Sequence, residues 1–367
     1  MQRIRLVFFF LCISYKCFAG NYVYDYNINC SKAYQYYMSL QLEQGRAEIF
    51  KEFKANPHNL MATYICDYED CLLLLFNGSK NDYEQRKSHF DERLSLLNKG
   101  DAHSPWFRIC KAGVYLHWAL VNFRMGENLK ATIAFRRSYL LVKENERLFP
   151  AFEYNKVLSG IGETLAGTIP DNYKWIASIL GVSGSVTKGA GLLSGFVNTH
   201  SINDPLQAEA MIYYTYLRFY FLSQKEEAWN YLNSDEFPLQ DNLLNLFLKV
   251  NIAVNYRKAD KAIETIVSAQ KNKEYSSFPI FDYEMGTALL CKLDTTCLYY
   301  FQRFLKNYRG PTFIKDTWQM MALSYYLQEK MPNARYCKEY IKKHGSAQTD
   351  ADKQAQRFSE TTIIFFI

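Results

Sequence analysis

The chain has 367 residues, of which 49% are hydrophobic and 22% charged, so it is long enough for a large buried core and too apolar to be disordered. Its 9 Pro and 17 Gly are few, which favours long helices over the many turns of a β-protein. The formal net charge of +6 falls to +3 without residues 1–19, and this near balance gives no indication of nucleic-acid binding.

Residues 1–19 have the pattern of an export signal. Arg3 and Arg5 form a short basic start, an apolar run follows over residues 6–15, and Ala19 marks the expected cleavage site. The apolar run is too short to span a membrane comfortably, and no later segment approaches the roughly 18 apolar residues that a spanning helix needs. We therefore expect an exported protein, periplasmic or envelope-associated or secreted.

The cysteines do not define a site. Cys12 and Cys17 lie in the signal, and neither follows the small residue that a lipoprotein signal requires, so we expect a protein without a lipid anchor. The other seven are Cys30, Cys66, Cys71, Cys110, Cys291, Cys297 and Cys337. Their odd number excludes complete pairing within one monomer. Buried thiols are the default expectation, and disulfides stay open in an oxidising compartment.

We expect helices almost throughout the mature chain and no strand. The predicted helices span residues 31–54 with a break near Gly45, 59–76, 81–98, 104–125, 128–144, 152–168, 171–180, 186–199, 204–223, 225–233, 240–255, 259–271, 279–291, 295–308, 313–328 and 331–344. Ser104-Pro105 and Asp204-Pro205 each place a capping residue before a proline that suits the first helical position. Thr349 caps a further helix, which runs towards an apolar tail at residues 361–367.

Small residues recur at intervals of 34, 36 and 36 residues in the second half of the chain. This interval is typical of a tetratricopeptide unit, in which two helices cross closely at small side chains. The predicted second-helix positions are Ala228, Ala262, Leu298 and Ala334, and the facing positions are Tyr216, Val250, Gly286 and Ala322. An earlier unit has Trp118-Ala119, the turn residue Gly126, the crossing residue Ala131 and Phe135 in the same register. The pattern predicts an all-α, tetratricopeptide-like solenoid over residues 20–360.

A Gly-rich block, residues 167–195, interrupts this rhythm. We expect it to be a structural joint, with the two halves of the solenoid meeting near residues 167–203. Trp175 and Ile179 are then expected to be buried against the preceding helix pair, and Gly191 and Gly195 to share a helix face. The alternative is that the glycines open a ligand cleft.

The segment from Lys156 to Phe196 carries a family resemblance. Its most specific part is GTIPDNYKW at residues 167–175, followed by Gly181, Gly184, Gly189 and Gly191, with NPHN at residues 56–59 and FIKD at residues 313–316. It resembles a family of tetratricopeptide repeat proteins exported by Bacteroidetes-type bacteria, and more distantly the eukaryotic inclusion-body-clearance family. The resemblance implies the fold and export, and it brings no assigned catalytic residues.

No motif indicates catalysis, a cofactor or a metal. In residues 184–189 the lysine precedes the second glycine and no strand leads in, which excludes a phosphate loop. Ser183 lacks the second glycine of a hydrolase elbow. No two histidines are spaced i, i+4 as in a helical zinc motif. Glu84, His89 and Glu92 share one helix but lie mostly on different faces, so we interpret them as surface charges.

We therefore expect a non-catalytic interaction or scaffolding module that binds a protein or peptide partner. The repeat register suggests a partner groove lined by Tyr115, Asn122, Tyr216, Phe219, Asp282, Lys315, Gln319 and Tyr325. The first alternative is a glycan-binding protein like the starch-binding helical-repeat lipoproteins of Bacteroidetes, which exposed Trp and Tyr residues would support. An enzyme on a helical scaffold is the other alternative, and no constellation of residues supports it.

Overall fold

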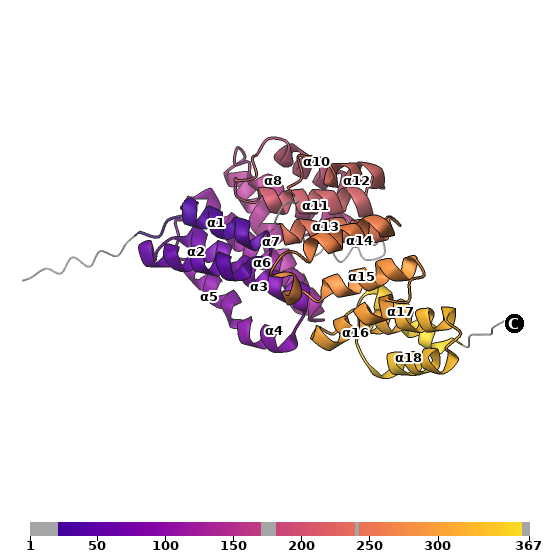
Figure 1. Ribbon diagram of the computed structural model, residues 1–367. Coiled ribbons are helices and arrows are strands. Elements are labelled where there is room, and N and C mark those ends of the chain that lie inside the picture. The colour runs from indigo at the N-terminus through magenta and orange to yellow at the C-terminus, as the bar shows by residue number, and fades with distance from the viewer. Residues whose placement is uncertain (1–20, 170–180, 239–241, 362–367) are drawn as a thin grey trace, which may run out of the picture.

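A computed structural model describes residues 21–169, 181–238 and 242–361 (Figure 1). This part of the chain is helical, and its only β contact is an isolated bridge between Val23 and Asn59. The α-helices are α1 (Ile28–Tyr37), α2 (Leu42–Ala55), α3 (Leu60–Asn77), α4 (Lys80–Arg86), α5 (Ser88–Leu97), α6 (Pro105–Arg124), α7 (Asn128–Leu148), α8 (Asn155–Gly167), α10 (Val186–Val197), α11 (Gln207–Tyr220), α12 (Lys225–Leu232), α13 (Leu243–Asn255), α14 (Ala259–Ala269), α15 (Ile280–Cys291), α16 (Cys297–Asn307), α17 (Ile314–Leu327), α18 (Met331–Lys343) and α19 (Asp350–Glu360). The prediction of an all-α fold is confirmed.

The helices pair through one recurring turn. In six helix pairs, the turn after the first helix contains a residue with a left-handed backbone conformation, with φ between 56° and 81°. A residue in this conformation commonly terminates an α-helix. These turn residues are Leu40, Gly126, Ser223, Arg257, Leu293 and Glu329. At five of them the next amide donates a hydrogen bond to a carbonyl five residues earlier, as Lys258 does to Ala253 at 2.8 Å. The short turn forces the second helix back along the first.

A small residue follows five positions after most of these turns. Ala228, Ala262 and Ala334 occupy this position and are completely buried, as the repeat spacing predicted. Leu298 is only half-buried at the equivalent place. In that pair the close contact is instead between Gly286 of α15 and the ring of Phe301, which lies 2.6 Å from where a Gly286 side chain would begin.

Two long predicted helices are each divided in two. The predicted helix 31–54 is broken, as expected, but the break lies at the turn of Leu40 instead of near Gly45, which is inside α2 and packed against the Tyr37 ring. The predicted helix 81–98 breaks at Lys87 into α4 and α5. Helix α11 begins later than predicted, at Gln207, because Leu206 has a left-handed backbone conformation with φ 68°, which a right-handed helix cannot contain. The Asp204 carboxylate accepts a hydrogen bond from the Ser201 amide in the preceding loop.

The helix starts at Pro105 and Thr349 are as predicted. Pro105 occupies the first turn of α6, and the Thr349 hydroxyl accepts a hydrogen bond from the Asp352 amide at 3.0 Å. Helix α19 therefore begins where its cap predicts.

Helices α8 and α10 cross at glycines. A side chain on Gly189 would lie 2.6 Å from the Gly160 carbonyl oxygen, and one on Gly160 would lie 2.7 Å from Leu193. Gly191 and Gly195 lie on one face of α10, as expected, and that face meets open space, whereas the close contact is made by Gly189. Trp175 and Ile179, expected to be buried here, lie outside the described residues.

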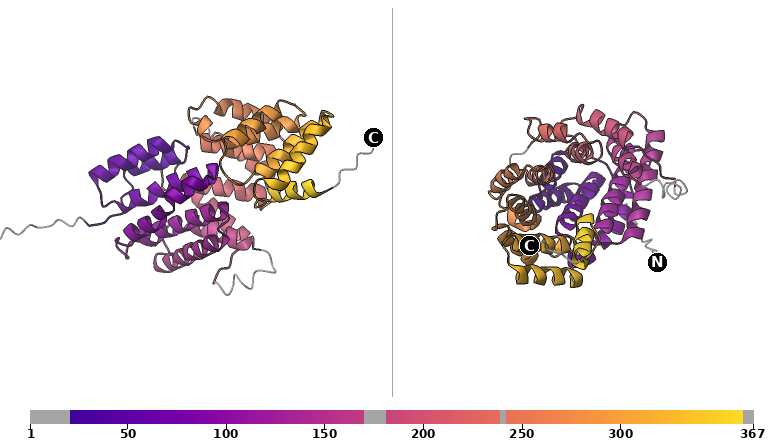
Figure 2. Two further views of the ribbon diagram at one scale, coloured as in Figure 1. Left: turned by 90° about the horizontal axis from the view of Figure 1, so that it is seen from below. Right: turned by 90° about the vertical axis from the view of Figure 1, so that its right-hand side faces the viewer.

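The helix pairs wind around a centre, and the last helices return to the first ones (Figure 2, right). The return is fixed by side chains from distant parts of the chain. Arg124 at the end of α6 donates a hydrogen bond to the Tyr308 hydroxyl at 2.7 Å, and Gln348 donates to the Phe123 carbonyl. Asn77 at the end of α3 donates to the Ser277 carbonyl at 3.2 Å. The inward helix faces thereby enclose a central space.

Candidate functional site

The central space is a cavity of about 730 Å³. Its wall comes from the inward faces of α3, α6, α11, α13, α15, α17 and α19, together with Met38 and Phe313 at helix ends, whereas α7, α12, α14, α16 and α18 contribute nothing to it. The apolar part of the wall consists of Met38, Leu72, Leu75, Phe76, Leu120, Ile212, Leu244, Phe247, Leu248, Val254, Ile280, Phe313, Met320 and Ala351. A volume of this size is typical of a small-molecule site.

Helix periodicity directs these side chains inward. On α6 the wall residues are His117, Leu120 and Arg124, which follow the i, i+3, i+7 spacing of one helix face. On α3 the second half, CLLLLFN at residues 71–77, is apolar on all sides, so it can face both the cavity and its neighbouring helices. The ring of Phe76 meets that of Phe247 at a centroid distance of 4.9 Å, which places α3 against α13.

A buried polar group closes one end of the cavity. The Tyr68 hydroxyl donates a hydrogen bond to the Glu209 carboxylate at 2.6 Å, joining α3 to α11. The Nε2 atom of His117 lies 3.7 Å from the other Glu209 oxygen. Burial opposes charge on the imidazole, but the hydrogen bond with Asp67 and the neighbouring Glu209 raise the pKa of His117 to about 9. His117 is therefore a cation at neutral pH.

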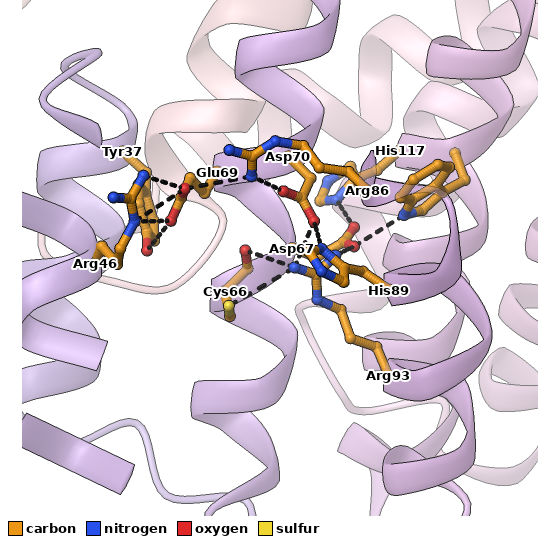
Figure 3. Close-up of polar contacts among 11 residues, drawn as sticks. Tyr37, Arg46, Cys66, Asp67, Glu69, Asp70, Arg86, His89, Arg93 and His117 are labelled. Atoms are coloured by element: carbon orange, nitrogen blue, oxygen red, sulfur yellow. Dashed lines mark hydrogen bonds and ion pairs between the residues drawn. The ribbon is translucent and has the colours of Figure 1, made fainter. Parts of the chain in front are cut away.

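Behind this end, Asp67 holds a network of charges within the core (Figure 3). Its two oxygens accept hydrogen bonds from Arg93 at 2.7 Å, from His117 at 2.8 Å and from the Trp118 indole at 3.0 Å. Asp67 is completely buried, and Arg93 is 8% exposed. Such a network fixes the position of His117 in the cavity wall.

The network continues outward through α3 (Figure 3). Asp70 pairs with Arg86, with His89 at 2.7 Å and with Arg93 at 2.6 Å. Burial opposes its ionisation, yet the charge of Arg93 and the hydrogen bonds from His89, Arg86 and Arg93 hold the pKa of Asp70 below its usual value. Glu69 pairs with Arg46 at 2.7 Å. His89 was predicted to be a surface charge, and its contact with the buried Asp70 corrects that prediction.

Two further carboxyl groups line the cavity from α15 and α17. Glu284 of α15 accepts a hydrogen bond from Asn251 at 2.8 Å, and Asp316 of α17 accepts one from Tyr283 at 2.5 Å. Burial raises the pKa of Glu284 to about 7 and that of Asp316 to about 6, and the charge on Asp316 adds to the effect on Glu284. Within the described part of the chain, neither carboxyl has a basic group within 4.0 Å.

Arg124, near the end of α6, also lines the cavity. Its guanidinium donates to Tyr308 and lies 4.9 Å from the centre of the Phe313 ring. Burial lowers the pKa of Arg124, but an arginine stays charged in proteins. No carboxylate among the described residues lies within 4.0 Å of it.

The structure does not gather the eight residues predicted to line a partner groove. Tyr216 alone among them lines the cavity. Phe219 is 1% exposed and belongs to the core between α11 and α12. The other six lie apart on α6, α15 and α17. On α6, the Tyr115 ring packs against Phe90, and the Asn122 side chain accepts a hydrogen bond from the Tyr83 hydroxyl. On α15 and α17, Asp282 pairs with Arg303, Lys315 donates to the Ile341 carbonyl, Gln319 is buried and Tyr325 is half-buried.

Sequence reasoning missed the charged network and the cavity carboxyls. Three acids at positions 67, 69 and 70 interrupt the apolar sequence of α3, and buried acids require partners. These three acids in an apolar helix could therefore have predicted a buried charged network. Asp316 gave no such signal, since an acid in the first turn of a helix is usually interpreted as favourable to the helix dipole. Glu284 lies among the mainly apolar residues of α15 and belongs to no motif.

No protein-family model matches the sequence, and no curated protein is similar to it at a significant level. Over the ranges that the structure describes, no group of three or more His, Cys, Asp or Glu side chains is arranged to hold a metal ion. None of the helices there has the length and apolar character needed to cross a membrane. The geometry of the cavity is therefore the basis for assigning a function.

Proposed function

We propose that this chain is an exported, non-catalytic binding protein of the tetratricopeptide-like type, and that its ligand is an elongated apolar molecule held in the central cavity. The cavity wall supports this proposal. Five of its helices, α6, α11, α13, α15 and α17, are first helices of pairs, whose inward faces are where helical-repeat proteins bind their ligands, and α3 and α19 complete the wall. This proposal keeps the binding role expected from the sequence and moves the binding site from the predicted groove to the cavity between the helix pairs.

The apolar wall determines the ligand class. Leucine, isoleucine and phenylalanine side chains from α3, α11 and α13 face the same space, and an apolar ligand would remove that surface from water. Burial of apolar area stabilises a complex by roughly 25 cal/mol per Å². A polar glycan would gain little from these walls. The Trp residues within the described ranges are buried or half-buried, so they offer no open platform for a sugar.

A cavity-filling substitution tests the proposal. Thr287 lines the cavity on α15, and Thr287→Trp places an indole in the ligand space. We expect isothermal titration with 1-decanol to show binding to the natural protein and at least ten-fold weaker binding to this variant. Thr132→Trp is the matched control, because Thr132 is exposed on α7, which lines none of the cavity. Equal decanol binding by both variants, or no binding by the natural protein, would contradict the proposal.

A further inference from the structure

We propose that the ligand carries an ammonium group, which binds at the acidic-aromatic wall of the cavity, defined here as Glu284, Asp316, Tyr216, Tyr283 and Phe313. This inference rests on the proposed function and adds the chemistry of the ligand head group. The ligand class is an apolar amine, with its chain along the leucine-rich wall and its cation between the two carboxyls.

The first argument is the absence of a partner cation in the described structure. Glu284 is 3% exposed and Asp316 is 4% exposed, and each has one neutral hydrogen-bond donor, from Asn251 and Tyr283 respectively. Buried carboxylates in proteins are normally paired with a cation or coordinate one. Here the charges that do lie near are acidic: Asp316 acts on Glu284, and Asp352 acts on Asp316. An entering ammonium would supply the missing positive charge.

The second argument is the aromatic character of the same wall. The rings of Tyr283 and Phe313 lie 5.1 Å apart, and Tyr216 stacks on Tyr220 at 5.8 Å. Aromatic faces attract cations by their quadrupole, most strongly where water is excluded. Carboxyl groups beside aromatic rings therefore favour an ammonium over a hydroxyl group of the same size.

Arg124 raises the competing possibility of an anionic head group. Its guanidinium is already in contact with the Tyr308 hydroxyl and the Phe313 ring, and the charge of Asp352 acts on it. A carboxylate bound there would also lie on the same side of the cavity as Asp316. Three carboxyl groups line the cavity, those of Glu209, Glu284 and Asp316, against the two cations Arg124 and His117. His117 is already paired with Asp67 and Glu209, so the field near Glu284 and Asp316 favours a cation.

Three probes with the same chain and different head groups separate these possibilities. Decylamine, 1-decanol and decanoate are titrated into the full chain at pH 7.5 and followed by calorimetry. We expect decylamine to bind about ten-fold more tightly than decanol, because charge-assisted hydrogen bonds exceed neutral ones by roughly that factor. Decanoate is expected to bind most weakly. Tighter or equal binding of decanol or decanoate would overturn the ammonium inference and leave the apolar cavity standing, whereas binding of none would contradict the proposed function itself.

Substitution of the carboxyl provides the second measurement. Glu284→Gln keeps the size of the side chain and can still accept the Asn251 hydrogen bond. We expect it to abolish the preference for decylamine over decanol while decanol binding stays within about two-fold of the natural protein. Glu264→Gln is the control, because Glu264 is exposed on α14 and pairs with Lys261 outside the cavity. A Glu284→Gln protein that unfolds cooperatively and retains the full preference for the amine would refute the inference.

Discussion

At the scale of single residues, the buried carboxyl groups of Asp67 and Glu284 are accommodated in different ways. Asp67 is completely buried and remains tolerable because Arg93, His117 and Trp118 donate to it. Glu284 has one neutral donor, so burial shifts its pKa to about 7. The first arrangement holds the wall in place, whereas the second leaves a carboxyl that can respond to a ligand.

The Glu284 carboxyl makes the stability of the protein depend on pH. Its pKa is about 7 in the folded chain against an ordinary value of 4.5, so between these values the folded state holds a proton that the unfolded state has released. The free energy of unfolding therefore decreases as pH rises through this range, by up to about 3 kcal/mol from this group. We expect Glu284→Gln to remove that part of the decrease, as measured by urea unfolding at pH 5 and pH 8. A variant with an unchanged pH dependence would contradict the assignment.

At the scale of helices, local signals predicted most elements, and tertiary packing decided the exceptions. The start of α6 at Pro105 and the cap of α19 at Thr349 depend on neighbouring residues alone, so the sequence was sufficient for them. The break at Lys87 has no proline or glycine to mark it. There the two short helices α4 and α5 place Arg86 and Arg93 against the acids of α3. These ion pairs are tertiary contacts, and local periodicity does not predict them.

The crossing of α8 and α10 predicts that alanine substitution changes the free energy of unfolding in opposite directions at two glycines of α10, Gly189 and Gly191. A methyl group on Gly189 would meet the Gly160 carbonyl oxygen at 2.6 Å, so Gly189→Ala should force the helices apart and destabilise the protein by about 1–3 kcal/mol. Gly191 has no neighbour within 4 Å of that position, and Gly191→Ala should stabilise α10 by about 0.4–1 kcal/mol through the unfolded state. Thermal and urea unfolding measure both. A destabilised Gly191→Ala protein would show that the face is covered in solution.

At the scale of the whole molecule, the cavity exists because the winding brings the last helices back to α3 and α6. No interval between small residues encodes that return, which is why the cavity could not be predicted from the sequence. The repeat register did predict buried Ala228, Ala262 and Ala334, since each crossing is made within one helix pair. The wall of the cavity instead combines side chains from Met38 to Gln354. Whether these side chains face one space depends on the small rotation of each helix pair relative to the next, added over all the pairs.

Asp352 connects the closing helix α19 to the rest of the wall. It is completely buried, and its carboxylate accepts hydrogen bonds from the Phe313 amide at 2.7 Å and the Asp316 amide at 3.2 Å, at the start of α17. It also accepts from the Thr349 hydroxyl at 2.6 Å, so one side chain holds the starts of α17 and α19 together. Gln354, two residues further along α19, lies in the cavity wall.

We therefore expect Asp352→Ala to loosen the closure. Loss of a charged acceptor that serves several donors should lower the free energy of unfolding by roughly 1–3 kcal/mol, and amide hydrogen exchange should accelerate in α19 and at the start of α17. Decanol should also dissociate faster, because α19 forms part of the cavity wall. Asp350→Ala is the matched control on the same helix turn: its side chain is fully exposed and pairs with Lys353 alone among the described residues. If both variants exchange at the natural rate in α17 and α19, Asp352 does not couple the two helices, and the closure of the cavity depends on the contacts of Arg124 and Gln348 instead.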